Sequence, residues 1–99
     1  MKRKPYKFII NIKKRQLKYK NYLNYTEKQG ITPTIIRFIL FMSDNKYKST
    51  YEIGLYMKYV YIEQVYRLIN YTKERIPTIE ITNRKGIGYR LKNKIYIDY

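Results

Sequence analysis

The stretch IPTIEITNRKGIGYRL, residues 76–91, sets the pattern from which the rest of the fold is read. After Pro77 the apolar residues alternate, which puts Ile79 and Ile81 on one face of an extended strand. The polar run at residues 83–86 forms a turn whose tip is cationic, with Arg84 and Lys85, and residues 87–91 form the returning strand. The stretch therefore predicts a β-hairpin, and residues 95–99 predict one more strand.

The segment before this hairpin has helical spacing instead. Residues 61–75 predict a helix that Pro77 ends. One face of this helix is apolar and consists of Ile62, Val65, Ile69, Thr72 and Ile76. The opposite face is polar and carries Glu63, Gln64, Arg67, Asn70, Tyr71 and Glu74.

Two shorter helices precede it. Thr32 followed by Pro33 is typical of a helix start, and residues 43–45 end this first helix. Ser49 and Glu52 match a capping box, so the second helix spans about residues 50–57. Its apolar stripe is expected to be Ile53, Tyr56, Met57 and Val60, and Gly54 is expected to allow a close helix crossing.

The N-terminal third leaves two interpretations open. Residues 7–12 alternate as a strand. Leu17 and Tyr19 would lie on one face of a second strand, but Tyr19 and Leu23 are four apart, as in a helix that Gly30 would end. We favour an N-terminal strand pair, with residues 15–28 as strand rather than helix.

Composition excludes several classes of function. The 99 residues fit one domain, and without His or Cys the chain lacks the commonest metal ligand, general base and thiolate nucleophile. We therefore expect no enzyme, no metal and no cofactor. The longest apolar run, residues 35–42, is interrupted by Arg37 and is too short for a bilayer, so we expect a cytoplasmic protein without a membrane partner.

The charge points to a polyanion as partner. The net charge is +15, and residues 1–30 carry ten basic side chains against one acidic. The basic residues Lys2, Arg3, Lys4, Lys13, Lys14 and Arg15 form either an arm that binds nucleic acid or a merely soluble tail. Abundant Lys, Ile, Tyr and Asn also suit AT-rich coding, as in a phage or mobile element of a low-GC bacterium.

The order of elements predicts an α+β fold of the winged helix-turn-helix class. Residues 1–30 are the basic N-terminal strand segment, residues 32–76 hold a three-helix core, and residues 78–99 hold the hairpin wing and a C-terminal strand. Residues 1–99 then form a single winged-helix domain. In such a fold the third helix fits the major groove, and the wing reaches the backbone or the minor groove of double-stranded DNA.

The wing also resembles that of a known family. Residues 85–91, KGIGYRL, resemble the Arg-Gly-Val-Gly-Tyr-Arg-Leu run of OmpR/PhoB-type winged-helix domains, and Ile31-Thr32-Pro33 resembles their Leu-Thr-Pro helix start. The resemblance implies a DNA-binding domain that regulates transcription, here standing alone without the phosphorylatable receiver domain. The sequence departs from the family in its shorter link between helices two and three, and residues 70–73 replace the family's Arg-Leu-Arg-Lys run.

Ten residues form the expected DNA-binding set. Gln64, Arg67, Asn70 and Tyr71 would read bases, because Gln and Asn pair with adenine and Arg with guanine. Arg84 and Lys85 would contact phosphate or the minor groove, and the flanking contacts would be Ser49, Lys48, Lys58 and Tyr59, with Lys46 as a further clamp. Each is also readable as an ordinary solvated side chain or, for the wing tip, as a charged turn that discourages edge pairing. Tyr89 is expected to pack against the third helix rather than to touch DNA.

Three functions stay open at this stage. The leading one is a sequence-specific double-stranded DNA-binding protein that regulates transcription, either monomeric or as a homodimer. The second is a winged-helix adaptor that binds a replication, polymerase or repressor protein, since a fold does not fix a function. The third is RNA or single-strand binding, which the 14 tyrosines suggest.

Overall fold

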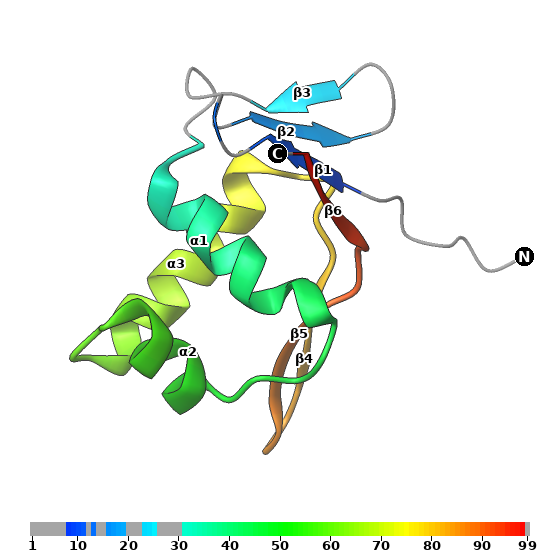
Figure 1. Cartoon of the computed structure of the whole chain (residues 1–99). Helices are drawn as coiled ribbons and strands as arrows, with labels where there is room; N and C mark the ends of the chain where they lie inside the picture. The colour runs from blue at the N-terminus through cyan, green and yellow to red at the C-terminus, as the bar shows by residue number, and fades with distance from the viewer. Residues whose placement is uncertain (1–7, 12, 14–15, 20–22, 26–30, 99) are drawn as a thin grey trace, which may run out of the picture.

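The structure, a computed structural model, describes residues 8–11, 13, 16–19, 23–25 and 31–98, which form three α-helices and two small β-sheets (Figure 1). The fold class is therefore α+β. The elements along the chain are β1 (Phe8–Asn11), β2 (Gln16–Tyr19), β3 (Leu23–Tyr25), α1 (Pro33–Phe41), the 3₁₀ turn η2 (Met42–Asp44), α2 (Thr50–Met57), α3 (Ile62–Arg75), β4 (Ile81–Arg84), β5 (Gly88–Leu91) and β6 (Ile95–Asp98). In this part of the chain no helix is long and apolar enough to cross a membrane.

The larger sheet brings the first and last strands together. Its order is β3-β2-β1-β6, with β1 antiparallel to β2 and parallel to β6. The predicted strand pair is present, and the strands β2 and β3 decide against a helix over residues 15–28, of which residues 15, 20–22 and 26–28 lie outside the described part. The side chains of Phe8 and Ile10 are fully buried, whereas Ile9 between them is 36% exposed. Alternation therefore turns one face of the sheet toward the core.

The helices begin at the caps that the sequence predicts. The hydroxyl of Thr32 accepts a hydrogen bond from the amide of Ile35 at 3.3 Å. The amide of Glu52 donates to the hydroxyl of Ser49 at 3.0 Å, and the Ser49 amide donates back to the Glu52 carboxylate at 3.1 Å. These bonds satisfy amides that the first turn of a helix leaves open, which fixes where α1 and α2 start.

The apolar stripes of α2 and α3 differ from prediction at the turn between them. Tyr56, on the predicted stripe of α2, is 39% exposed and stacks against Phe41 with the ring centroids 4.1 Å apart. Val60 is 83% exposed and Ile62 is 49% exposed, although the sequence predicts that both pack inward. The reason is that α2 ends at Met57 and Lys58 takes a left-handed conformation with φ 60°, which redirects the chain. A Cβ on Gly54 would lie 3.6 Å from Cγ2 of Val65, an ordinary contact, so this helix crossing does not require a glycine.

The turn of the hairpin begins two residues later than predicted and ends one residue later. Arg84 pairs with Gly88 as the last rung of the ladder between β4 and β5, so the turn consists of residues 85–87 rather than 83–86. The amide of Ile87 donates to the carbonyl of Arg84 at 2.9 Å, and Gly86 supplies the positive φ of 79° that this turn needs. Figure 1 shows the hairpin running away from the larger sheet.

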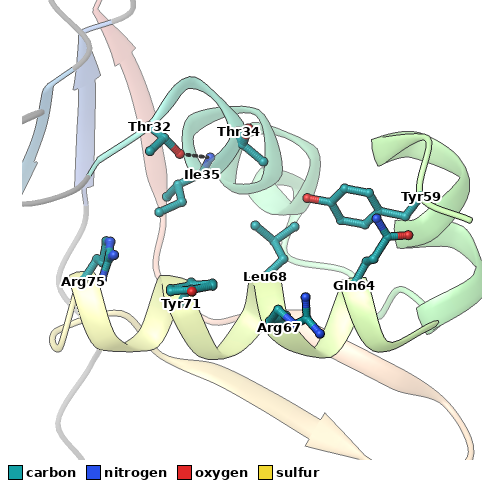
Figure 2. A pocket seen from close by; sticks show the side chains of 9 residues that line it. All are labelled: Thr32, Thr34, Ile35, Tyr59, Gln64, Arg67, Leu68, Tyr71 and Arg75. Atoms are coloured by element: carbon teal, nitrogen blue, oxygen red, sulfur yellow. Dashed lines mark hydrogen bonds between the residues drawn. The ribbon is translucent and has the colours of Figure 1, made fainter. Parts of the chain in front are cut away.

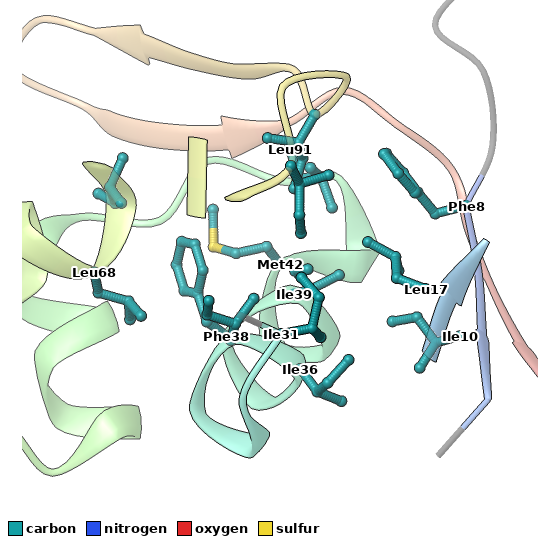
Figure 3. Close-up of a cluster of buried hydrophobic side chains, with 14 of the residues drawn as sticks. Phe8, Ile10, Leu17, Ile31, Ile36, Phe38, Ile39, Met42, Leu68 and Leu91 are labelled. Carbon is teal, nitrogen blue, oxygen red and sulfur yellow. The ribbon is translucent and has the colours of Figure 1, made fainter. Parts of the chain in front are cut away.

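Both sheets and the helices share one core (Figure 3). Phe8 and Leu17 from the larger sheet, Phe38 from α1, Met42 from η2 and Leu91 from β5 are each at most 1% exposed. The sheet therefore contributes fully buried side chains to the same hydrophobic core as the helices. The core therefore fixes the hairpin and α3 relative to each other.

Candidate functional site

A groove lies where the start of α2, the middle of α3 and the hairpin tip meet. It has a volume of about 370 Å³ and is lined by Ser49 and Thr50 from α2, Tyr66 from α3, and residues 83–89 of the hairpin. Arg84 and Lys85 at the tip are exposed. Three segments far apart in the sequence thus present hydroxyl groups, an aromatic ring and two cations to one surface.

Backbone hydrogen bonds hold the hairpin against the start of α2. The amide of Lys48 donates to the carbonyl of Tyr89 at 2.7 Å, and the amide of Tyr89 donates to the carbonyl of Lys48 at 2.8 Å. Gly88 makes this approach possible, because a Cβ there would lie 2.1 Å from the Lys48 carbonyl oxygen. These contacts hold β5 directly against the residues that precede α2. Tyr89 is half-buried and packs against the core, and it also lines the groove.

The loop after α1 anchors the other end of the hairpin. Asn45 has a φ of 60° and donates through its side-chain amide to the carbonyls of Leu91 at 2.7 Å and Asn93 at 2.8 Å. The Asn93 side chain accepts from the amide of Glu80 at 2.7 Å. The hairpin is thus bonded at both its middle and its base.

The polar face of α3 is divided between two surroundings. Arg67 and Asn70 are exposed, as expected of residues that contact a partner. Gln64, Arg67 and Tyr71 also line a second hollow of about 330 Å³ between α3 and the start of α1 (Figure 2). The predicted base-reading set therefore does not form one patch with the hairpin tip; it extends toward α1.

Gln64 also has a structural task. Its side-chain oxygen accepts hydrogen bonds from the amides of Val60 and Tyr61, both at 2.9 Å, and so caps the start of α3. The side-chain NH₂ group stays available to donate, so Gln64 is a partial fit to the base-reading role. Ser49 is similar, because its oxygen caps α2 while its own hydroxyl proton can still be donated.

Lys48 does not suit the role of phosphate clamp. Lys48 is only 8% exposed, and its ammonium group donates to the carboxylate of Asp44 at 2.6 and 2.7 Å. Lys46 and Lys58 are exposed, and Tyr59 is half-buried. The structure thus leaves Lys46 and Lys58 accessible from the flanking set and removes Lys48 from it.

The pair of Asp44 and Lys48 also has an electrostatic signature. Partial burial acts to raise the pKa of Asp44, but the hydrogen bond from Lys48, the amide of Lys46 and the charges of both lysines outweigh it. The pKa of Asp44 therefore lies below its usual value of about 3.8. The ammonium of Lys48 also lies 5.3 Å from the ring centroid of Phe41, so the pair is held between η2 and α1.

Tyr66 and Thr50 are lining residues that the sequence reasoning missed. Tyr66 lies one turn before Asn70 and is 43% exposed, so it faces the groove beside the hairpin. The available signal was its spacing of four from Asn70.

A third surface is apolar. Large side chains gather around the turn between α2 and α3, and these are Tyr51, Leu55, Val60, Tyr61 and Ile62, from 49% to 83% exposed. All five line one shallow pocket of about 240 Å³. Contiguous apolar surface of this kind is uncommon on a soluble domain and often marks contact with a partner.

Comparison with known proteins does not place the chain in a family. No protein-family model matches the sequence, and no significant similarity to a characterised protein or to a solved structure is found. Among the residues that the structure describes, no group of three or more Asp or Glu side chains gathers as a metal site would require.

Proposed function

We propose that this chain is a winged helix-turn-helix protein that binds double-stranded DNA in a sequence-specific way and regulates transcription. The observation that carries the proposal is the shared groove of α2, α3 and the hairpin tip, on a chain of net charge +15. A helix with exposed polar side chains fits the major groove, and a basic hairpin beside it reaches the neighbouring backbone. No catalytic or cofactor role is proposed.

In this proposal the parts have different tasks. Arg67 and Asn70 read base edges, since Arg pairs with guanine and Asn with adenine. Arg84 and Lys85 contact phosphate or the minor groove, which adds affinity at the cost of salt sensitivity. Gln64, Tyr71, Lys58 and Ser49 contribute contacts at the flanks, through the donors that their structural roles leave free. Tyr66 offers its ring to a base within the wing groove.

The test is a mobility-shift titration against mixed genomic fragments at several salt concentrations. Wild type is expected to shift a few fragments discretely, and Arg67→Ala is expected to relax that selection by about 1–3 kcal/mol at one base pair. The double change of Arg84 and Lys85 to Ala is expected to weaken all fragments alike and to lower the salt slope by about two.

A matched control changes the same charge elsewhere. Lys92 and Lys94 are exposed and lie between β5 and β6, at the opposite end of the hairpin from its tip. Changing both to Ala should leave the shifts nearly intact. Equal loss from both double variants, or release of every fragment alike as salt rises, would reject the specific regulator, and preference for a single-stranded competitor would favour RNA or single-strand binding.

A second function has its own observation in support. The apolar surface of Tyr51, Leu55, Val60, Tyr61 and Ile62 would suit an adaptor for a replication, polymerase or repressor protein. The net charge of +15 favours a partner whose apolar surface is rimmed by acidic residues and opposes a second copy of this chain. Changing Leu55 and Val60 to Ser separates the two functions. An adaptor should then lose its protein partner, whereas a DNA-binding regulator should shift DNA fragments as the wild type does.

A further inference from the structure

The hollow between α1 and α3 is chemically different from the groove at the hairpin tip. Its floor includes Leu68, and the tyrosines Tyr59 and Tyr71 lie on either side of that side chain (Figure 2). Arg75 lies beyond Tyr71, with its guanidinium carbon 5.1 Å from the Tyr71 ring centroid, and Arg67 stands on the same face of α3. Thr34 closes the hollow from the side of α1.

Charge in this hollow is of one sign. None of the nine side chains that line it is acidic, and two are guanidinium groups. In the described part of the chain the salt bridge joins Lys48 to Asp44, so neither Arg67 nor Arg75 is paired with a carboxylate there. Arginine presents planar donors that match carboxylate and phosphate oxygens, and its charge is available to a ligand.

The other side chains that line the hollow favour a ligand whose anionic group is attached to an aromatic ring. Leu68 and Ile35 supply apolar surface, and the tyrosine rings supply flat surfaces that prefer offset or edge contact with another ring. The volume of about 330 Å³ is at the small end of the range for pockets that hold small molecules. A flat ring could cover Leu68 while a charged group reaches Arg67 or Arg75.

We propose that this hollow is a binding site for a small aromatic anion, a planar ring that carries a carboxylate or phosphate group. Binding itself is independent of any role in DNA recognition. One consequence does rest on the proposed function: because Arg67 belongs both to this hollow and to the base-reading face, the bound anion competes with DNA. The ligand would then release the protein from its site.

The experiment uses 2-naphthoate as the anionic probe and 2-naphthamide as its neutral counterpart, titrated into the full chain without DNA. Binding is followed by NMR, through the backbone amide shifts of Thr34, Leu68 and Tyr71, and by calorimetry. The test variant is Arg75→Gln, which lies outside the proposed DNA-reading set. Lys73→Gln is the matched control, since Lys73 is exposed, lies on the same helix and does not line the hollow.

Saturable shifts confined to the hollow are expected with naphthoate, together with a much weaker response to the amide. Arg75→Gln should weaken naphthoate binding about tenfold or more, as for loss of a hydrogen bond to a charged group, whereas Lys73→Gln should change it less than twofold, roughly the scale of a screened surface charge. Thermal melts of both variants establish that they fold, and the wild-type shift map needs no variant at all.

Three outcomes would overturn the site. These are no saturation below about 10 mM, equal binding of acid and amide, or equal weakening by both variants, which would indicate only diffuse attraction to a basic protein. Competition is measured separately, by adding naphthoate to a complex with a DNA fragment that the chain has been found to shift. Naphthoate that binds without releasing DNA leaves the site standing and refutes the competition, and failure to find such a fragment refutes the proposed function alone.

Discussion

Replacing Gly88 with Ala should separate the hairpin from the start of α2. The new Cβ would lie 2.1 Å from the carbonyl oxygen of Lys48, 2.5 Å from its carbonyl carbon and 2.9 Å from Cα of Ser49, all of them backbone atoms. Backbone atoms cannot rotate away as a flexible side chain can, so the backbone at residue 88 and the backbone at residues 48–49 must move apart. The reciprocal hydrogen bonds between Lys48 and Tyr89, at 2.7 and 2.8 Å, are then lost or lengthened.

The size of the effect follows from those contacts. Two backbone hydrogen bonds contribute about 1 kcal/mol each, and a φ of 137° adds about 1–3 kcal/mol of strain for a residue with a side chain. The expected loss in the free energy of unfolding is therefore about 3–5 kcal/mol. For a chain of this length that is a large part of the total, about 5–15 kcal/mol.

Gly86→Ala is the matched control. Gly86 also has a positive φ, 79°, but nothing lies within 4 Å of where its Cβ would be. Its cost should be limited to the left-handed penalty of about 1–2 kcal/mol. The assay is equilibrium unfolding in urea for both variants and wild type under one buffer condition. Equal destabilisation by the two alanines would refute the reasoning, because it would mean that the contact with Lys48 and Ser49 contributes nothing.

Three other changes test separate features of the fold. Ser49→Ala removes one half of the reciprocal cap at α2 and should lower the free energy of unfolding by about 1 kcal/mol in urea unfolding; no loss would deny the cap its role. Asp44→Asn should be less stable than wild type at neutral pH, because Lys48 then loses its anionic partner. The folded pKa of Asp44 is lowered, so the stability it contributes is present above its unfolded value of about 3.8 and is lost as pH falls through the folded pKa. Wild type and Asp44→Asn should therefore converge in acid, and a constant difference across a pH series of unfolding curves would contradict that assignment. Phe8→Ala should cost about 3–5 kcal/mol, since Phe8 is fully buried in the shared core, and retention of wild-type stability would mean that the larger sheet is not part of the cooperative unit.

Local signals explain why the helices and the hairpin could be predicted. Thr32 before Pro33 and the pair of Ser49 and Glu52 specify helix starts through contacts three residues apart, and those contacts are present at 3.0 to 3.3 Å. Pro77 ends α3 because a proline cannot continue its hydrogen bonding. Such features need no knowledge of the rest of the chain.

What could not be predicted depends on contacts distant in sequence. Nothing in residues 95–98 indicates a parallel partner at residues 8–11, since strand pairing at that separation has no local signature. Lys48 reads as a surface lysine until its carboxylate partner and its burial are known. The division of the α3 face between the groove beside the hairpin and the hollow beside α1 likewise depends on where α1 and the hairpin lie, so the sequence alone does not single out Tyr66 or Arg75.

The parallel pairing of β1 with β6 has a mechanical consequence. The two strands run in the same direction, with Phe8 opposite Ile95 and Asn11 opposite Asp98. Pulling β1 toward the N-terminus and β6 toward the C-terminus therefore slides one strand along the other. In that geometry all the hydrogen bonds between the two strands are loaded at once, whereas strands peeled from one end break them singly. We therefore expect the domain to resist force applied through these two strands more than its modest size suggests, with the helices and hairpin shielded from tension until the pair slips.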